Sequence, residues 1–186
     1  AYFKLRVGYI TYNQSINQII GVVKVDRITE SLINELIQNL GFKSKGQSKD
    51  FEKLVNYTVF SNEYNKTFDL DNVTVGEGDD TGIDGIGIIV NGHLIENADE
   101  INDLVETNNF LEVEYIFTQA KTSSNFDGGE LNTFIFGVED FFSTEPKLRR
   151  NSDIQKFADI SNVIFEKASL FRSNPRLKLF YVTTGK

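Results

Sequence analysis

Apolar residues recur at helical spacing in several parts of the chain. From Asp26 to Leu40 they repeat every three or four positions, and Gly41 follows, which predicts a helix that ends there. A second helix is predicted after a polar loop, with Ser48 or Asp50 as its N-cap. The same spacing predicts further helices over about 98–106, 131–142 and 154–171, the last of them ended by Asn174-Pro175.

Other segments have the composition and alternation of strands. Strands are predicted over 72–75, 82–90, 94–95, 111–121 and 177–184. Asn91-Gly92 stands between two of them and is typical of a two-residue hairpin turn. The predicted order is helices, then a meander of strands, then helices and a last strand, which indicates an α/β fold.

Polar residues interrupt two otherwise apolar strand faces. Gln119 and Lys121 continue the face of Phe117, and Asp84 is expected to share its face with Ile86. If the two strands pair antiparallel, the start of the first lies beside the end of the second. A carboxylate, an amide and an ammonium group would then meet at one end of the sheet.

Composition restricts the classes of protein that fit. The 186 residues are 40% hydrophobic, which is typical of one globular domain, and no cysteine and a single histidine exclude disulfides and most thiolate or histidine chemistry. Residues 1–25 show no clean period, so we expect an amino-terminal extension followed by a domain over 26–186. A buried strand near the end suggests a fragment of a longer protein, with further carboxy-terminal domains as partners. The longest apolar runs are too short to span a membrane, and a cytoplasmic protein is expected.

Charge is unevenly distributed. The net charge is −8, and no Lys or Arg occurs between Thr67 and Ala120, where acidic residues accumulate. This part of the chain should attract cations before phosphates. The basic residues Lys147, Arg149 and Arg150 follow a predicted helix and are candidates for contact with nucleic-acid phosphates.

Two motifs and the order of the predicted elements resemble the PD-(D/E)XK nuclease superfamily. In that superfamily an Asp opens the second core strand, and an acidic residue or Gln, followed by any residue and Lys, ends the third; Asp84 and Gln119-Ala120-Lys121 match those places. The approach Gly82-Ile83-Asp84-Gly85 is similar to the Mrr-like branch. The stretches 82–90, 117–124 and 137–142 are most similar to AIPR (abortive infection phage resistance) proteins, which are usually longer.

The resemblance implies a restriction-endonuclease-like core, with a mixed central sheet flanked by helices. It also implies hydrolysis of nucleic-acid phosphodiesters, with DNA as the expected substrate, in bacterial anti-phage defence. Mg²⁺ or Mn²⁺ would be held by Asp84, the Gln119 side-chain oxygen and the Ala120 carbonyl, which are the hard oxygen ligands that magnesium prefers. Lys121 would orient the attacking water or stabilise negative charge. An acid on the first core helix often adds a ligand in this superfamily, and Glu52 is the first candidate, ahead of Glu35 and Glu63.

Gln119 departs from the acidic residue at this place and removes one negative charge from the proposed metal site. An alternative is therefore a catalytically inactive module that binds nucleic acid or a partner protein. A third interpretation is a structural domain whose first 25 residues mediate assembly, and a homodimer fits the sequence as well as a monomer does.

Overall fold

The fold is a mixed β-sheet with helices on both faces, seen in a computed structural model that describes residues 8–9, 27–76, 78–79, 81–123 and 125–184. The strands are β1 (Gly8–Tyr9), β2 (Gly85–Val90), β3 (His93–Leu94), β4 (Val113–Lys121) and β5 (Arg176–Thr183), in the spatial order β1-β5-β4-β2-β3. The helices are α1 (Arg27–Leu40), α2 (Gln47–Glu63), α3 (Asp99–Asn108), α4 (Gly128–Phe141) and α5 (Ser152–Glu166). The prediction of an α/β fold is confirmed.

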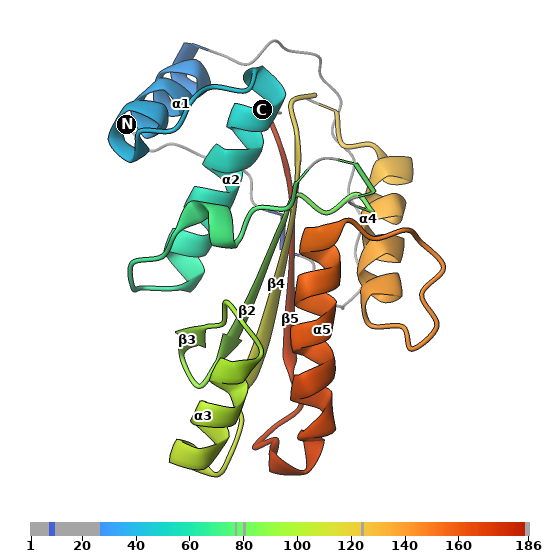
Figure 1. Ribbon diagram of the computed structural model, residues 1–186. Coiled ribbons are helices and arrows are strands. Elements are labelled where there is room, and N and C mark those ends of the chain that lie inside the picture. Colours follow the sequence, from blue (N-terminus) through green and yellow to red (C-terminus); the bar gives the residue numbers. More distant parts are fainter. Residues whose placement is uncertain (1–7, 10–26, 77, 80, 124, 185–186) are drawn as a thin grey trace.

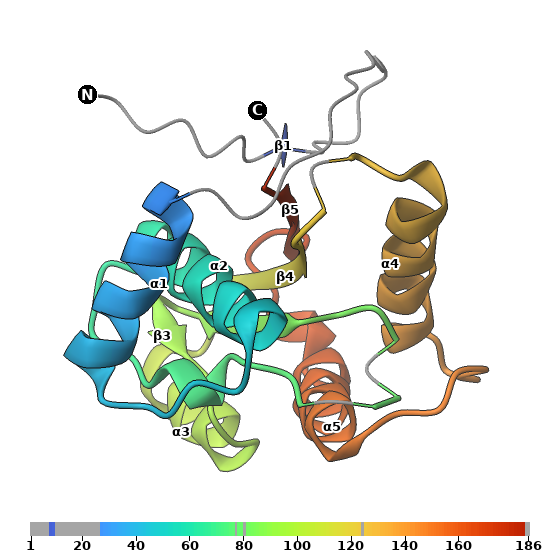
Figure 2. The same cartoon turned by 90° about the horizontal axis from the view of Figure 1, so that it is seen from above.

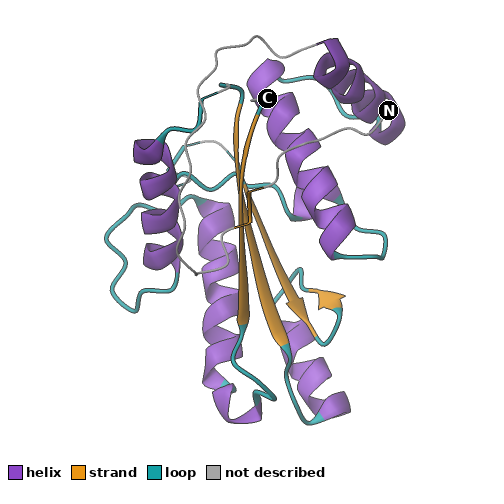
Figure 3. Cartoon of the chain, turned by 180° about the vertical axis from the view of Figure 1, so that it is seen from behind, coloured by secondary structure: helices purple, strands orange, loops and turns teal. Residues whose placement is uncertain are grey.

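Each face of the sheet has its own hydrophobic core. Figures 1 and 3 show α1 and α2 on one side of the sheet and α4 and α5 on the other. Alternation along β4 divides its side chains between the two cores, because Ile116 and Ala120 pack with α1 and α2 while Tyr115 and Phe117 pack with α4 and α5. β4 is thus buried on both faces along nearly its whole length, including its polar residues Glu114, Thr118 and Gln119.

The pairing of β2 with β4 is antiparallel, as expected. Gly85 lies opposite Thr118 and Val90 opposite Val113, so the start of β2 is beside the carboxyl end of β4. β5 runs parallel to β4, and the connection between them contains α4 and α5, which cover one face of the sheet. This topology brings the chain before β2 and the ends of β4 and β5 to the same end of the sheet.

The hairpin predicted at Asn91-Gly92 is confirmed. Val90 pairs with His93 across the turn, and Asn91 and Gly92 have φ angles of 51° and 75°. Two successive positive φ values define the turn that matches the twist of the flanking strands, and Asn-Gly is the sequence best suited to it.

The segment predicted as a strand over 72–75 is instead mostly irregular. A short 3₁₀ helix, Leu70–Asn72, comes first, and a single antiparallel bridge then joins Thr74 to Gly85. The Asp69 side chain accepts a hydrogen bond from the Asp71 N–H at 2.9 Å, which fixes this turn locally. Val73 and Val75 are buried as expected, but among the described residues the segment pairs with the sheet only at this one bridge.

Two predicted helix boundaries were wrong. α2 begins at Gln47 with Gly46 as its N-cap, so Ser48 and Asp50 lie inside the helix. The Asp50 carboxylate instead accepts hydrogen bonds from Ser44 Oγ and the Lys45 N–H, at 2.5 and 3.0 Å, and orders the loop before the helix.

The last helix is shorter than its apolar spacing indicated. α5 ends at Glu166, and a 3₁₀ turn, Ala168–Leu170, follows before Asn174-Pro175 is reached. Leu170 and Phe171 still pack against the core of the α4 and α5 face, which explains why the apolar pattern continues past the end of the helix. Residues 1–25, which the sequence left without predicted structure, lie outside the described residues apart from Gly8–Tyr9.

Close approach of α2 to β2 makes Gly87 sensitive to substitution. A Cβ built on Gly87 would overlap the ring of Phe60, which is fully buried, so we expect Gly87→Ala to lower the free energy of unfolding by about 1–3 kcal/mol. Urea denaturation measures this loss. Gly128→Ala is the control, because the same construction at Gly128 meets nothing within 4 Å; equal stability of the two variants would contradict this packing.

Candidate active site

Asp84 is held at the point where β2 begins. Its N–H donates to the Thr118 carbonyl at 2.9 Å, and its own carbonyl accepts from the Val75 N–H at 3.1 Å and from Asn56 Nδ2 at 2.9 Å. One oxygen of its half-buried carboxylate, Oδ2, accepts from the Ala120 N–H at 2.8 Å. The side chain thereby satisfies a backbone donor at the end of β4.

The alternation of side chains along β2 was expected to put Asp84 on the face of Ile86, but it does not extend back to Asp84. β2 starts at Gly85, and Ile83 packs into the same core as Ile86 although the two are three positions apart. Strict alternation would place them on opposite faces, so the pattern is interrupted at Asp84 and Gly85. The carboxylate consequently bonds along the edge of β4, to Ala120, rather than joining the row of isoleucines.

The backbone of Ala120 offers an oxygen on the same edge. In an antiparallel ladder, the N–H and C=O of one residue point to the same neighbouring strand. Because the Ala120 N–H reaches the Asp84 carboxylate, the Ala120 carbonyl projects from the same edge of β4. The Ala120 carbonyl and the Asp84 carboxylate therefore lie along the same edge of β4.

Gln119 is buried on the face of β4 that is covered by α4, whereas the side chain of Ala120 is on the α2 face. The Gln119 side chain is 2% exposed, and Oε1 has no hydrogen-bond partner among the described residues. A Cβ built on Gly82 would be 3.2 Å from Gln119 Nε2 and 3.5 Å from a methyl carbon of Thr133 in α4. Gly82, with φ of 75°, therefore lets the loop before Asp84 pass close to this amide.

Lys121 is partly exposed at the end of β4. Its ammonium lies 3.7 Å from Oε1 of Glu130, in the first turn of α4. The other oxygen of Glu130 accepts a hydrogen bond at 3.2 Å from the hydroxyl of Tyr181. Tyr181 is in β5, opposite Gln119.

Burial of the ring and the nearby Glu130 carboxylate both raise the pKa of Tyr181 above its usual value, and Asp127 adds to the effect. The hydroxyl is therefore protonated at neutral pH and acts as a donor. No pattern in the sequence indicates a role for Tyr181 or Glu130. Tyr181 belongs to a predicted strand, and only the pairing of β5 with β4 brings it to this end of the sheet.

Glu52 is placed on the opposite face of the sheet from Gln119. It lies in α2, is 7% exposed and forms an ion pair with Lys49 at 2.6 Å. Asn56, one helical turn later, reaches the Asp84 carbonyl, so Glu52 is on the stripe of α2 that approaches this end of the sheet. Figure 2 looks down on this end, with α2 and α4 on opposite sides of β4.

The two weaker helix candidates lie elsewhere. Glu35 is exposed on α1, and Glu63, at the last position of α2, forms an ion pair with Lys178. Burial lowers the pKa of Lys178, but hydrogen bonds to Glu63 and Glu114 outweigh it and raise the pKa overall. Glu63 is therefore engaged at the opposite end of α2 from Glu52.

The three basic residues after α4 differ in their surroundings. Lys147 and Arg149 are exposed, whereas the Arg150 guanidinium donates to the carbonyls of Asp140 and Phe141 at 2.6 and 3.2 Å. Arg150 thus satisfies the carboxyl end of α4. Contact with phosphates stays a prediction for Lys147 and Arg149, and Arg150 already has a structural role.

The residues proposed as metal ligands offer oxygen donors, the type that Mg²⁺ prefers. Among the described residues, no three His, Cys, Asp or Glu side chains gather closely enough to hold a metal ion. The proposed ligand set has only Asp84 and Glu52 as carboxylates, and it depends on the Gln119 amide and the Ala120 carbonyl for the rest. The buried Gln119 oxygen without a partner and the carboxylate next to Ala120 are compatible with Mg²⁺ or Mn²⁺.

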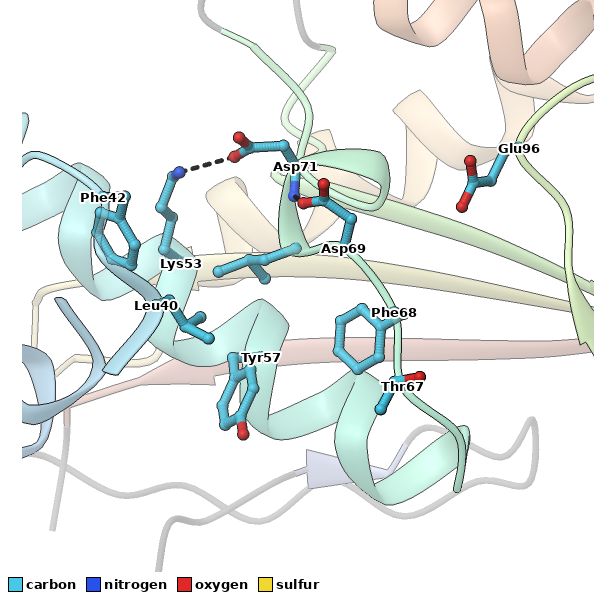
Figure 4. A pocket seen from close by; sticks show the side chains of 10 residues that line it. Leu40, Phe42, Lys53, Tyr57, Thr67, Phe68, Asp69, Asp71 and Glu96 are labelled. Atoms are coloured by element: carbon cyan, nitrogen blue, oxygen red, sulfur yellow. Dashed lines mark hydrogen bonds and ion pairs between the residues drawn. The ribbon is translucent and has the colours of Figure 1, made fainter. Parts of the chain in front are cut away.

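A separate surface groove of about 560 Å³ lies beside α2. Figure 4 shows Phe42, Tyr57 and Phe68 in it, together with the ion pair between Lys53 and Asp71, at 2.8 Å. Asp84, Gln119 and Lys121 are not among its lining residues. The candidate site is instead the end of the sheet, where the Asp84 carboxylate contacts the Ala120 N–H and Lys121 forms an ion pair with Glu130.

No protein-family model, curated protein or solved structure matches the chain. In the described ranges, none of the helices combines the length and apolar character needed to cross a membrane.

Proposed function

We propose that this domain has a restriction-endonuclease-like core and is a metal-dependent nuclease. Its reaction is the hydrolysis of phosphodiester bonds in nucleic acid, with DNA as the expected substrate. The resemblance of its motifs to AIPR proteins supports a role in bacterial anti-phage defence. The observation that carries the proposal is the hydrogen bond between the Asp84 carboxylate and the Ala120 N–H, which joins the two sequence motifs at one end of the sheet. The helix, meander, helix and strand order supports it.

The proposed ligands have distinct roles. Asp84, the Ala120 carbonyl and the Gln119 amide oxygen would hold Mg²⁺ or Mn²⁺, with Glu52 approaching from α2. When bound, the ion supplies charge neutralisation on the phosphate and a lowered pKa for water. Asp84 is kept in place by two backbone–backbone hydrogen bonds, by the Ala120 N–H to its carboxylate and by Asn56, so its carboxylate needs little reorganisation.

Lys121 would act on the reacting groups. In the hydrolysis, a water oxygen forms a bond to phosphorus, the bond to the leaving oxygen breaks, and that oxygen takes up a proton. An ammonium group at the end of β4 can hold the water by hydrogen bonding and stabilise the negative charge that develops on the phosphate oxygens.

Replacement of Lys121 tests the proposal directly. We expect Lys121→Ala to lower plasmid cleavage in Mg²⁺ or Mn²⁺ by about 100-fold, because one fixed charge donor is worth about 3 kcal/mol in the transition state. Lys156→Ala, an exposed lysine of α5, is the matched control and should cleave as the parent does. Equal rates for Lys121→Ala and the parent would remove the proposed site.

A catalytically inactive nuclease-like module is the second candidate, favoured by the neutral amide of Gln119 where superfamily members often carry an acid. Such a module would bind nucleic acid or a partner protein without hydrolysis. Calorimetric titration of the parent with Mn²⁺ separates the two: binding that disappears in Asp84→Asn supports the nuclease, and no binding at all supports the inactive module.

A further inference from the structure

Glu130 connects two residues at the end of the sheet that sequence analysis left unrelated. Its Oε1 lies 3.7 Å from the Lys121 ammonium, and its Oε2 accepts the Tyr181 hydroxyl hydrogen bond at 3.2 Å. Lys121 ends β4 and Tyr181 is in the neighbouring β5, so one carboxylate from α4 spans two adjacent parallel strands.

The position of Glu130 is itself fixed. Asp127 is the N-cap of α4 and accepts from the N–H groups of Gly129 and Glu130 at 2.7 and 3.2 Å. Glu130 is thus the third residue of the helix, where the helix dipole favours a carboxylate. Tyr181 is 3% exposed and its ring packs with Phe126 and Phe134, so the hydroxyl that holds Glu130 cannot move far.

Lys121 has the longest side chain of the three and the most rotatable bonds. A lysine side chain has four rotatable bonds and loses about 2 kcal/mol of conformational freedom when it is fixed. An ion pair between partly exposed groups contributes at most about 1 kcal/mol to stability, so this contact does little to hold the fold together. Its consequence is local, since it restricts where the ammonium can be.

We propose that Glu130, anchored by Tyr181, is the positioning residue of Lys121 and holds its ammonium at the end of β4. Glu130 acts through Lys121 and does not touch the substrate. The inference rests on the proposed function for its effect on cleavage, but the restriction of Lys121 can be measured without any activity.

The first measurement is the NMR order parameter of the Lys121 ammonium group, by ¹⁵N relaxation in the parent and in Glu130→Gln. We expect the order parameter to fall in Glu130→Gln, and to fall less in Tyr181→Phe, which keeps the carboxylate but removes its anchor. Glu139→Gln is the matched control, because Glu139 is an exposed glutamate of the same helix. An order parameter unchanged by Glu130→Gln would overturn the proposal.

The second measurement is a double-mutant cycle on cleavage. Loss of positioning should lower kcat about 10-fold in Glu130→Gln with little change in KM, since misplacement of a catalytic group reduces its effect on the transition state. In a Lys121→Ala background, Glu130→Gln should have no further effect. Additive losses would contradict action through Lys121, and a parent without cleavage would refute the proposed function while the NMR result still decides the role of Glu130.

Discussion

Asp84→Asn is expected to abolish calorimetric binding of Mn²⁺ and to lower plasmid cleavage by about 100- to 1000-fold. The metal is expected to supply several kcal/mol of charge stabilisation in phosphoryl transfer, and each 1.4 kcal/mol is a tenfold change in rate. Gln119 is neutral, so Asp84 is the one full negative charge that the two strand motifs contribute. Its removal should therefore cost more than the loss of the neutral Gln119 or Ala120 oxygen.

The substitution also separates chemistry from structure. The side-chain oxygen of the introduced asparagine can still accept the hydrogen bond that the Ala120 N–H now donates to the Asp84 carboxylate at 2.8 Å, so the free energy of unfolding should change little. Asp84→Ala leaves this backbone donor without its partner and should lower the free energy of unfolding by about 1–3 kcal/mol. Undiminished Mn²⁺ binding in a folded Asp84→Asn protein would exclude Asp84 as a ligand.

Much of the fold follows from local patterns in the sequence. Short windows of sequence were sufficient to predict helices α1 and α4, the Asn91-Gly92 hairpin and the buried strands β4 and β5. Periodicity and turn preference are local properties of the chain. The strand predicted over 72–75 was wrong because a local turn competes with it. The Asp69 turn before it is stabilised by its own side chain, and alternation over four residues cannot reveal such competition.

The candidate site was predicted less completely than the fold. Antiparallel pairing was sufficient to bring Asp84 to the end of β4, since register fixes which backbone groups meet. It did not reveal that the carboxylate bonds to the Ala120 N–H, which depends on the interruption of alternation between Ile83 and Ile86. The residues missed, Tyr181 and Glu130, come from later elements whose position depends on the parallel pairing of β5.

Asn56 shows how closely the site and the core are connected, and no local pattern indicated it. This fully buried residue of α2 donates from Nδ2 to the Asp84 carbonyl at 2.9 Å, and its Oδ1 accepts from the Thr118 hydroxyl at 2.5 Å. Gly85 makes this approach feasible, because a Cβ there would lie 2.5 Å from both Asn56 Oδ1 and Thr118 Oγ1. One amide thus joins α2 to the start of β2 and to β4.

Asn56→Ala is expected to lower the free energy of unfolding by about 2–4 kcal/mol. The Thr118 hydroxyl would be buried without its acceptor, and truncation would leave a cavity beneath α2. Asn62→Ala is the matched control on the same helix, because Asn62 is exposed and its side chain donates one turn back, to the Thr58 carbonyl. Urea denaturation should show the loss in the first variant and a change below about 0.5 kcal/mol in the second.

The same substitution should weaken the proposed active site through the backbone of Asp84. Without the Asn56 amide, the Asp84 carbonyl loses one donor and keeps the Val75 N–H, so the bend before β2 is held less firmly. Mn²⁺ affinity is therefore expected to fall by about 10-fold at a temperature where Asn56→Ala is still folded, as is typical when a group that orients a metal ligand is removed. Calorimetry in the folded range measures this. Unchanged affinity beside a clear loss of stability would restrict Asn56 to a role in packing, and would show that β4 and the Val75 N–H are sufficient to position Asp84.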